Sequence, residues 1–352
     1  MTHDPASAQV DATTPLGGLR AVVEGARALA ARGEAGVLAV VVETTGSTYR
    51  KPGALILLDA HGVHVGALSG GCLEGELETA ARAVLERGFA TDLRFDTSGD
   101  EDRVFGSGTG CGGSTRVRLL PLPAAVSPLR EALIEADELG AALELLLDNA
   151  TDFIGGGEAR IHGAAAEARR HRFDARGTAK NDDPGSPNEP IALVVRPAPR
   201  VLLLGAGPET PPLLRLTRML GWRVELAEHR QRWARFAEGC GIDRLHGGGP
   251  DTLPTLLDGT HFDAALVMNH NYLLDARGLT RLAATTIGYV GLLGPAARRD
   301  DLLAEIGPDA AARLRPRLHA PVGLPLGGEG AEAIALAIVA QLQGALTRRD
   351  GA

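Results

Sequence analysis

Two short glycine-rich turns of this chain each carry a cysteine, and a thiol in such a turn can contact a metal, carry sulfur or line a ligand pocket. The first turn reads Ser69-Gly70-Gly71-Cys72-Leu73-Glu74-Gly75, and the second reads Gly110-Cys111-Gly112-Gly113. Glycines allow backbone conformations closed to residues with a Cβ and a close approach to a ligand. Helical spacing of apolar residues after Cys72 places its sulfur at or just before a helix N-terminus, where backbone N–H groups favour the thiolate.

Either cysteine can instead be a small buried hydrophobe, because free cysteines are among the most buried residues. The second turn is also compatible with a mobile surface loop. Repetition favours a functional interpretation, since two of only three cysteines in the chain lie in glycine-rich turns. If the strands of this region are neighbours, both thiols can face one cleft.

A third polar stretch has the composition of an anion-binding loop. It reads Gly46-Ser47-Thr48-Tyr49-Arg50-Lys51-Pro52-Gly53 and follows a buried strand predicted over 37–42. The hydroxyls of Ser47 and Thr48 can orient an anion, while Arg50 and Lys51 supply positive charge. A solvated hairpin with an Arg-Lys pair has the same composition, so both interpretations stay open here.

The second half of the chain opens with the pattern of a dinucleotide-binding turn. A predicted strand runs into Gly205-Ala206-Gly207-Pro208-Glu209-Thr210 and a helix, and Glu228 follows Gly205 by 23 residues. Thr210 stands where the third glycine of that fingerprint would be, and Glu209 places negative charge where a pyrophosphate would rest. The residues therefore favour a Rossmann-like fold over NAD binding, with Gly205, Gly207 and Glu228 as the nucleotide-binding candidates.

His270 is the best placed of the histidines for a ligand site. It lies in Met268-Asn269-His270-Asn271, just past a predicted strand, at the edge where open α/β sheets bind ligands. Capping or loop hydrogen bonding would explain the same residue equally well.

The chain is predicted to be α/β, with a small N-terminal α/β domain and a C-terminal doubly wound parallel sheet. We expect a domain over 1–125, a helical and irregular connector over 126–198, with helix from 129 to about 147, and the Rossmann-like domain over 199–352. Periodicity predicts helices and strands over both domains. The expected helices cover 19–30, 73–87 and 331–347 and surround Trp233, Leu279 and Leu302; the expected strands cover 37–42, 55–58, 63–67, 93–95, 117–119, 201–204, 224–227, 262–268 and 287–293.

Composition narrows the functional classes. A length of 352 residues favours two domains, and a net charge of -8 without a long basic run argues against nucleic acid as a partner. Cys72, Cys111 and Cys240 are widely spaced, which fits reduced thiols better than a disulfide framework. The start of the chain lacks a secretory pattern, and the longest apolar helical run is too short to cross a bilayer. We therefore expect a soluble, cytoplasmic protein.

Taken together, these motifs resemble the XdhC/CoxI family, the xanthine dehydrogenase accessory factors. The N-terminal part of the resemblance rests on the loop 46–53 and the two cysteine turns. The C-terminal part rests on Gly205-Ala206-Gly207, Tyr289-Val290-Gly291-Leu292-Leu293-Gly294 and His319-Ala320-Pro321-Val322-Gly323-Leu324. Residues 121–190 contribute little to it.

The resemblance implies a chaperone that binds molybdenum cofactor (molybdopterin), supports its sulfuration by a cysteine desulfurase, and inserts it into an apo-molybdenum hydroxylase such as xanthine dehydrogenase. In that role Cys72 and Cys111 can lie near the molybdenum end, where ligation, sulfur relay and simple pocket lining all stay open. The two-domain architecture separately suggests a homodimer, in which one subunit would help to close the other's site. The residues that we expect to bind the cofactor are Ser47, Thr48, Arg50, Lys51, Gly70, Gly71, Cys72, Gly110, Cys111, Gly112, Gly113 and His270.

Two other functions remain open at this stage. An NAD(P)-dependent oxidoreductase would use the C-terminal domain, although no hydride-transfer acid is evident in the sequence. A sulfurtransferase would carry a persulfide on Cys72 or Cys111. We favour a cofactor-binding chaperone over a turnover enzyme.

Overall fold

The chain folds into two compact units, Leu16–Ala198 and a second that begins at Pro199, and each is described by itself. The computed structural model describes residues 18–62, 64–69, 73–96, 113–149, 156–162, 169–180, 189–253, 257 and 260–348, with the backbone alone at 64, 251 and 348.

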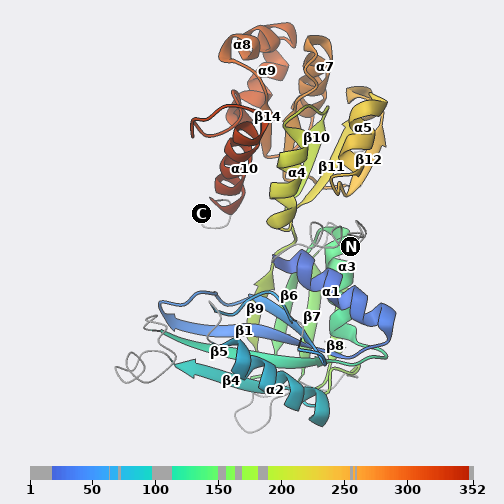
Figure 1. The fold of residues 1–352 in the computed structure, drawn as a ribbon, viewed down its shortest axis with the longest axis vertical. Coiled ribbons are helices and arrows are strands. Elements are labelled where there is room, and N and C mark those ends of the chain that lie inside the picture. The colour runs from blue at the N-terminus through green and yellow to red at the C-terminus, as the bar shows by residue number, and fades with distance from the viewer. Residues whose placement is uncertain are drawn as a thin grey trace, which may run out of the picture. The chain divides into compact units, whose positions relative to one another are not determined.

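The N-terminal unit is built on two antiparallel sheets (Figure 1). The first has five strands in the order β3-β2-β1-β5-β4, and the second has four in the order β8-β7-β6-β9. The elements are α1 (Gly18–Arg32), β1 (Gly36–Gly46), β2 (Leu55–Asp59), β3 (His64–Val65), α2 (Glu74–Arg87), β4 (Thr91–Asp96), β5 (Gly113–Leu122), α3 (Pro128–Leu139), β6 (Ala142–Leu147), β7 (Gly157–His162), β8 (Arg169–Phe173) and β9 (Ile191–Val195).

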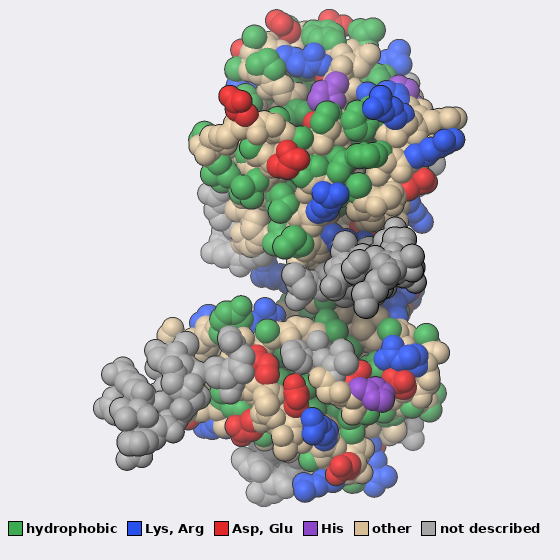
Figure 2. All heavy atoms as spheres, viewed as in Figure 1, with side chains coloured by type: hydrophobic (Ala, Val, Ile, Leu, Met, Phe, Trp, Pro, Cys, Tyr) green, Lys and Arg blue, Asp and Glu red, His purple; other side chains and the backbone are tan. Residues whose placement is uncertain are grey.

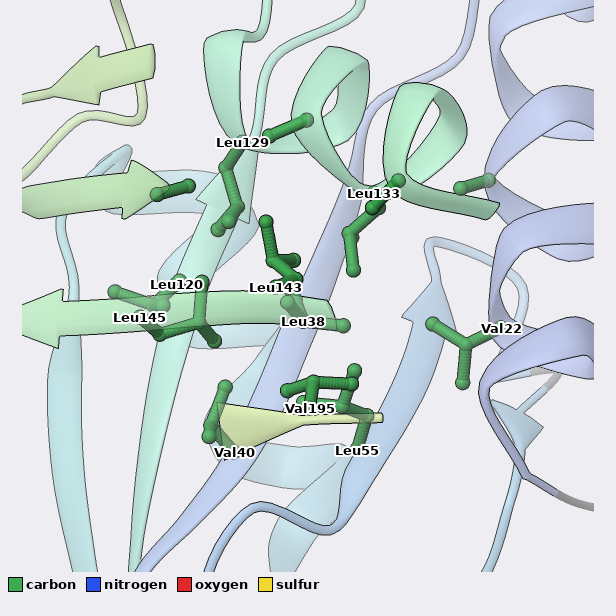
Figure 3. Packing of buried hydrophobic residues seen from close by; sticks show 14 of the residues in the cluster. Val22, Leu38, Val40, Leu55, Leu120, Leu129, Leu133, Leu143, Leu145 and Val195 are labelled. Atoms are coloured by element: carbon green, nitrogen blue, oxygen red, sulfur yellow. The ribbon is translucent and has the colours of Figure 1, made fainter. Parts of the chain in front are cut away.

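Strand β1 is buried on both faces, so its alternating side chains enter two different cores. Leu38 and Val40 belong to a cluster that includes Leu133 of α3 and Leu143 of β6 (Figure 3). Residues of the other face of β1, such as Ala39, pack in a cluster with side chains of α2. Helix α2 thus covers one face of the five-stranded sheet, while α1, α3 and the second sheet contribute to the core on its other face.

The expectation of a connector over 126–198 is corrected by the structure. This region forms α3 and the four-stranded sheet, and its side chains share a core with β1. Helix α3 ends at Gly140, which is left-handed with φ 62°, so the helix expected to reach Leu147 stops at Leu139. Strand β6 follows with Leu143, Leu145 and Leu147 fully buried, a period of two that belongs to a sheet.

A buried ion pair holds β4 against β5. Arg118 is fully buried, and its Nε donates to Oδ1 of Asp92 over 2.7 Å. Arg116 Nε donates to Oδ2 of the same carboxylate over 2.8 Å. Burial opposes ionisation of Asp92, but its bonds with the two guanidinium groups hold the pKa of that carboxyl below its usual value.

The C-terminal unit is a parallel sheet of six strands in the order β12-β11-β10-β13-β14-β15, as the doubly wound prediction requires. Side chains of α4, α5 and α10 pack in one apolar cluster, and those of α7, α8 and α9 pack in another. The elements are β10 (Arg200–Leu204), α4 (Thr210–Met219), β11 (Arg223–Glu228), α5 (Gln231–Glu238), β12 (Arg244–Gly247), η3 (Pro250–Thr252), β13 (Ala264–Val267), α7 (Tyr272–Ala283), β14 (Tyr289–Leu292), α8 (Ala296–Glu305), α9 (Pro308–Leu314), η4 (Arg315–Arg317), β15 (Leu318–His319) and α10 (Ala331–Arg348).

The expected α/β class and most of the expected elements are confirmed. The helices predicted over 19–30, 73–87 and 331–347 correspond to α1, α2 and α10, and the hairpin predicted over 55–67 corresponds to β2 and β3. Within the described part of the chain, no helix combines the length and the apolar character needed to span a bilayer.

Candidate functional site

Two of the three predicted stretches adjoin the same end of the five-stranded sheet, and the third follows a strand that points toward it. Strand β1 ends at Gly46, which lies opposite Gly113, the first residue of β5. Strand β4 runs antiparallel to β5 and ends with Asp96 opposite Ser114. Strand β3 is antiparallel to β2, and β2 is antiparallel to β1, so the chain that follows β3 runs in the same direction as β1. The topology therefore places the anion loop (residues 46–53) and the described residues that flank the second cysteine turn at one end of the sheet, and the chain that leads to the first cysteine turn runs toward that end.

Gly113 packs directly against the anion loop. A Cβ on Gly113 would lie 2.5 Å from the carbonyl oxygens of both Ser47 and Thr45, so only glycine fits without a shift. The neighbouring hydroxyl oxygens of Thr45 and Ser114 lie 2.9 Å apart. The structure thus brings two of the sequence-predicted stretches into contact.

The anion loop carries two cationic side chains, Arg50 and Lys51, that solvent can reach. Thr48 Oγ1 donates to the carbonyl oxygen of Arg50 over 3.0 Å, and Lys51 Nζ donates to Thr48 Oγ1 over 3.4 Å. Ser47 and Lys51 are exposed, and Arg50 is partly exposed. Among the described residues, neither Arg50 nor Lys51 forms an ion pair with a carboxylate. An anion can therefore bind both cations without displacing a described acidic partner.

Glu74 joins the described residues on the two sides of the first cysteine turn, a role that the sequence reasoning missed. Its carboxylate accepts from Ser69 Oγ at 2.6 Å, Ser69 N at 2.9 Å, Leu68 N at 3.2 Å and Leu73 N at 3.1 Å. Burial acts against the charged form, but the bonds with Ser69 and the backbone lower the pKa of Glu74. The position of Glu74 in the first turn of α2 could have indicated this role, because acidic residues there often accept hydrogen bonds from free backbone N–H groups.

The cysteine turns themselves lie outside the described residues. This applies to Gly70, Gly71, Cys72, Gly110, Cys111 and Gly112. The expectation that the two thiols face one cleft therefore stays a prediction. Cys240, the cysteine that is described, is reduced and packs against the apolar core of the C-terminal unit.

A second polar cluster lies at the carboxyl edge of the parallel sheet, where the strand order reverses between β10 and β13. Gly205 is left-handed with φ 84° and starts the turn after β10. The N–H groups of this turn are already used: Ala206 N donates to Glu228 Oε2 over 2.9 Å, and Gly207 N donates to Thr210 Oγ1 over 3.0 Å. In this conformation these two donors are not directed at a phosphate.

Arg230 binds both the Glu228 carboxylate and the turn. Its Nε donates to Glu228 Oε1 over 2.9 Å, and its Nη2 donates to Glu228 Oε2 and to the carbonyl oxygen of Ala206, each over 2.7 Å. The Glu228 side chain is fully buried. Burial opposes its charge, but the bonds with Arg230 and the Ala206 N–H bring the pKa of Glu228 below its usual value.

His270 and Glu209 lie over the same turn. The Nε2 atom of His270 is 2.8 Å from Oε1 of Glu209, and a Cβ on Gly207 would lie 2.3 Å from that nitrogen. The hydrogen bond with Glu209 raises the pKa of His270, although partial burial opposes this. Among the described residues, His270 is the one non-glycine with positive φ, at 53°. Backbone strain of this kind concentrates at functional sites.

The His270 loop is anchored by a buried carboxylate that the sequence reasoning missed. Asp275 Oδ1 accepts from Asn269 N at 3.1 Å and from Asn269 Nδ2 at 3.0 Å. Arg298 Nη2 donates to Asp275 Oδ2 over 2.7 Å. Within the described residues, no group of three His, Cys, Asp or Glu side chains is arranged to hold a metal ion. The cluster is therefore a set of ion pairs around a glycine turn.

The class of protein follows from these features: a Rossmann-like domain whose turn is covered by its own side chains, preceded by an antiparallel unit with a cationic glycine-containing loop. Comparison with family models then identifies the family. The model described as "XdhC and CoxI family" matches residues 29–96, and the model described as "XdhC Rossmann domain" matches residues 201–342. The chain belongs to the XdhC and CoxI family.

Two relatives span most of the chain. A Bacillus subtilis (strain 168) protein described as a probable subunit of xanthine dehydrogenase is 27% identical over 328 residues, covering 88% of this chain and 92% of the relative. A crystal structure of a protein from Bacillus halodurans, described as a xanthine dehydrogenase, is 27% identical with a TM-score of 0.75. The match covers 93% of this chain and 96% of that one.

Proposed function

We propose that this protein binds molybdenum cofactor, supports its sulfuration by a cysteine desulfurase, and inserts it into a molybdenum hydroxylase related to xanthine dehydrogenase. Family membership supports the general role in xanthine dehydrogenase maturation, since both relatives are described by the name of that enzyme. The cofactor is cargo in this proposal, and the chain acts as a carrier without turnover.

The observation that carries the proposal is the cationic loop at the end of the five-stranded sheet. Molybdopterin has an anionic phosphate at one end and a dithiolene at the other. Arg50 and Lys51 have no carboxylate partner among the described residues, so they can neutralise the phosphate. The lack of a Cβ at Gly113 lets the loop approach the start of β5, the strand that the second cysteine turn precedes.

The residues divide the work according to their chemistry. Arg50 and Lys51 would hold the phosphate, with hydrogen bonds from Ser47 and Thr48. Cys72 and Cys111 would meet the soft molybdenum and sulfur end, since thiolates suit soft metals. Direct ligation, sulfur relay through a persulfide and simple pocket lining remain three alternatives for these thiols.

Retention of cofactor tests the proposal. The full chain is loaded with molybdenum cofactor and passed through a desalting column, and molybdenum and pterin are quantified. We expect the Arg50→Ala/Lys51→Ala double variant to lose more than about tenfold in affinity, because two charge-assisted contacts disappear. Cys72→Ala and Cys111→Ala should each reduce retention as well. Arg50→Ala alone should also reduce retention, and Arg87→Ala, which removes one exposed arginine at the far end of α2, is its matched control.

Unchanged retention in the double cation variant and in both cysteine variants would overturn the assignment of this site. Mass spectrometry after incubation with a desulfurase separates the sulfur relay from the other thiol roles. An added sulfur on the peptide of Cys72 or Cys111 supports the relay, and its absence from both excludes it.

An NAD(P)-dependent oxidoreductase is the second candidate function, favoured by the Rossmann-like fold alone. Against it, the described N–H donors of the turn bind Glu228 and Thr210, and Glu209 lies over the turn. Titration with NADH followed by nicotinamide fluorescence decides the question. Saturation on the order of 1 µM to 1 mM, the usual range of enzyme substrates, would favour the oxidoreductase. We expect none.

The remaining expectations about assembly are part of the same proposal. A carrier that passes cofactor between partners would work in the reducing cytoplasm, where its thiols stay free. We propose a homodimer, in which one subunit helps to close the cofactor site of the other. Light scattering that gives a strict monomer at working concentration would exclude it.

A further inference from the structure

A groove of about 390 Å³ lies beside the glycine turn of the C-terminal unit, on the face formed by α4, α5 and α10. Its apolar wall is made by Pro211, Pro212, Trp233 and Phe236. Trp233 and Phe236 meet edge to face with ring centroids 6.1 Å apart, and Phe236 is 54% exposed. The groove is therefore an open aromatic surface instead of a closed core.

Helix α10, which lines the groove through Glu332, exposes further apolar side chains. On α10, Ile334 is 41% exposed and Leu336 is 51% exposed. Figure 2 shows hydrophobic side chains gathered over the face that carries α4, α5 and α10. Monomeric proteins seldom expose apolar side chains together in this way unless the surface binds something.

The charged side chains that line the groove have a net positive charge. Arg215 and Arg232 line it and are exposed, and Arg232 lies 5.8 Å from the centroid of the Trp233 ring. Among the described residues, neither arginine forms an ion pair with a carboxylate. Glu332 is the one acidic side chain that lines the groove. Two arginines beside aromatic rings are typical of the energetic centres of protein interfaces.

We propose that this groove docks an acidic segment of a partner protein that carries a large apolar side chain. The apolar side chain would insert against Pro211, Trp233 and Phe236, while carboxylates pair with Arg215 and Arg232. A small aromatic anion would fill the groove but leave the exposed side chains of α10 uncovered, so a protein segment fits the surface better. The proposal does not depend on the cofactor site of the N-terminal unit.

A peptide assay tests the charge and apolar requirements separately. The probe is a fluorescein-labelled peptide of alternating Glu, Asp, Leu and Phe, compared with a neutral analogue that has Gln and Asn and a basic analogue that has Lys. Anisotropy with the full chain should show the acidic peptide binding at least about tenfold more tightly than either analogue, because complementary charge adds to the same apolar contacts.

Variants then locate the binding. Arg215→Glu/Arg232→Glu should weaken the acidic peptide by at least about tenfold and reverse the preference toward the Lys peptide. Phe236→Ala should weaken all three peptides, since it removes an aromatic anchor. Arg232→Glu alone should also weaken the acidic peptide. Arg235→Glu makes the same single charge change on α5 at an exposed residue that does not line the groove, and it should leave binding nearly unchanged. The gained Lys-peptide affinity also shows that the double variant is folded.

Several outcomes would overturn the proposal. Equal binding of the three peptides would exclude charge recognition, and an equal loss in Arg235→Glu would reduce the effect to bulk charge. Displacement of the peptide by AMP at micromolar concentration would identify a small-ligand site. A dimer that dissociates in Phe236→Ala would identify the groove as an interface between two copies of this chain.

Discussion

The Nε2 atom of His270 lies 2.8 Å from Oε1 of Glu209, joining the loop after β13 to the residue before α4 across 61 positions of sequence. Glu209 is buried, whereas the His270 side chain is 45% exposed. This pair covers the glycine turn of the Rossmann-like domain, while Glu228 accepts from the N–H of Ala206 and Arg230 donates to the carbonyl oxygen of the same residue. The turn is therefore stabilised by its own ion pairs.

The first prediction concerns the pH dependence of this pair. The pKa of His270 is raised in the folded protein above its ordinary value of 6.5, chiefly by the bond with Glu209. A raised pKa means that the pair stabilises the fold fully below about pH 6.5 and loses this effect as pH rises through the folded pKa. His270→Asn removes the titration and tolerates positive φ, so we expect it to cost about 1 kcal/mol near pH 6 and less at alkaline pH.

Urea unfolding of wild type and His270→Asn at about pH 6 and about pH 9 measures this difference. A proton NMR titration of the imidazole gives the pKa directly, and Glu209→Gln should lower it. A stability difference that grows with pH would show that the imidazole does not stabilise the fold as a cation.

The second prediction concerns Glu228. Glu228→Ala leaves the Ala206 N–H and the Arg230 guanidinium without their carboxylate, so we expect a loss of about 2–4 kcal/mol in the free energy of unfolding. The pKa of Glu228 is lowered in the fold, so the stabilisation is present above the ordinary value of 4.5 and is lost as pH falls through the folded value.

Chemical denaturation at neutral pH checks the Glu228 prediction. Glu238→Ala removes an exposed glutamate from α5 and should change stability by less than about 0.5 kcal/mol. If the two variants lose the same small amount, Arg230 and the turn find other partners and the ion pair is not a main support of the turn.

Local sequence patterns predicted most of the C-terminal unit because its strands, helices and glycine turn are each specified by a short continuous stretch of the chain. The strand, the turn at Gly205 and the helix lie in one continuous stretch, and Glu228 ends the next strand. The partner of Glu209 was not predictable, because His270 reaches it only through the parallel register of β10 and β13. The sequence did indicate that negative charge at Glu209 disfavours a pyrophosphate.

The region over 126–198 was misjudged for a different reason. Leu143, Leu145 and Leu147 alternate into the core, but Leu146 interrupts the apolar-polar alternation that Glu144 begins, and α3 precedes this stretch with a true helical period. Strand β8 reads Arg-Arg-His-Arg-Phe and has the composition of a loop. The charges of Arg172 and Glu158 face each other across strands, with Nε to Oε2 at 2.8 Å, so the polar face belongs to the sheet.

The third prediction uses the contact between Gly113 and the anion loop. Gly113→Ala places a methyl group 2.5 Å from two carbonyl oxygens, so we expect a loss of about 1–3 kcal/mol and a displaced loop. Gly75→Ala is the matched control, because a Cβ there meets nothing within 4 Å and the residue lies in α2. That variant should be neutral or gain up to about 1 kcal/mol from helix propensity.

Thermal unfolding and cofactor retention are measured together for these two glycine variants. Gly113→Ala should lower both, whereas Gly75→Ala should lower neither. Normal cofactor retention in Gly113→Ala would show that the anion loop and the start of β5 do not need their close contact for binding.

The fourth prediction concerns Glu74, whose carboxylate binds Leu68, Ser69 and Leu73 on both sides of the first cysteine turn. Glu74→Ala leaves three backbone N–H groups without this acceptor, so we expect a loss of about 1–3 kcal/mol and faster amide exchange at Ser69 and Leu73. The pKa of Glu74 is lowered in the fold, so this support weakens as pH falls below its ordinary value of 4.5.

Hydrogen exchange followed by mass spectrometry on peptides covering 66–80 checks the Glu74 prediction. Glu76→Ala removes an exposed acid from the same helical turn and should leave exchange at Ser69 nearly unchanged, because Glu76 complements the helix dipole and its side chain forms no hydrogen bond with another described residue. Equal protection in wild type and Glu74→Ala would mean that the turn is held by other contacts. If Glu74→Ala then also retained less cofactor, the cause would be the lost negative charge. Glu74→Gln would in that case show the same loss of cofactor without a change in amide exchange.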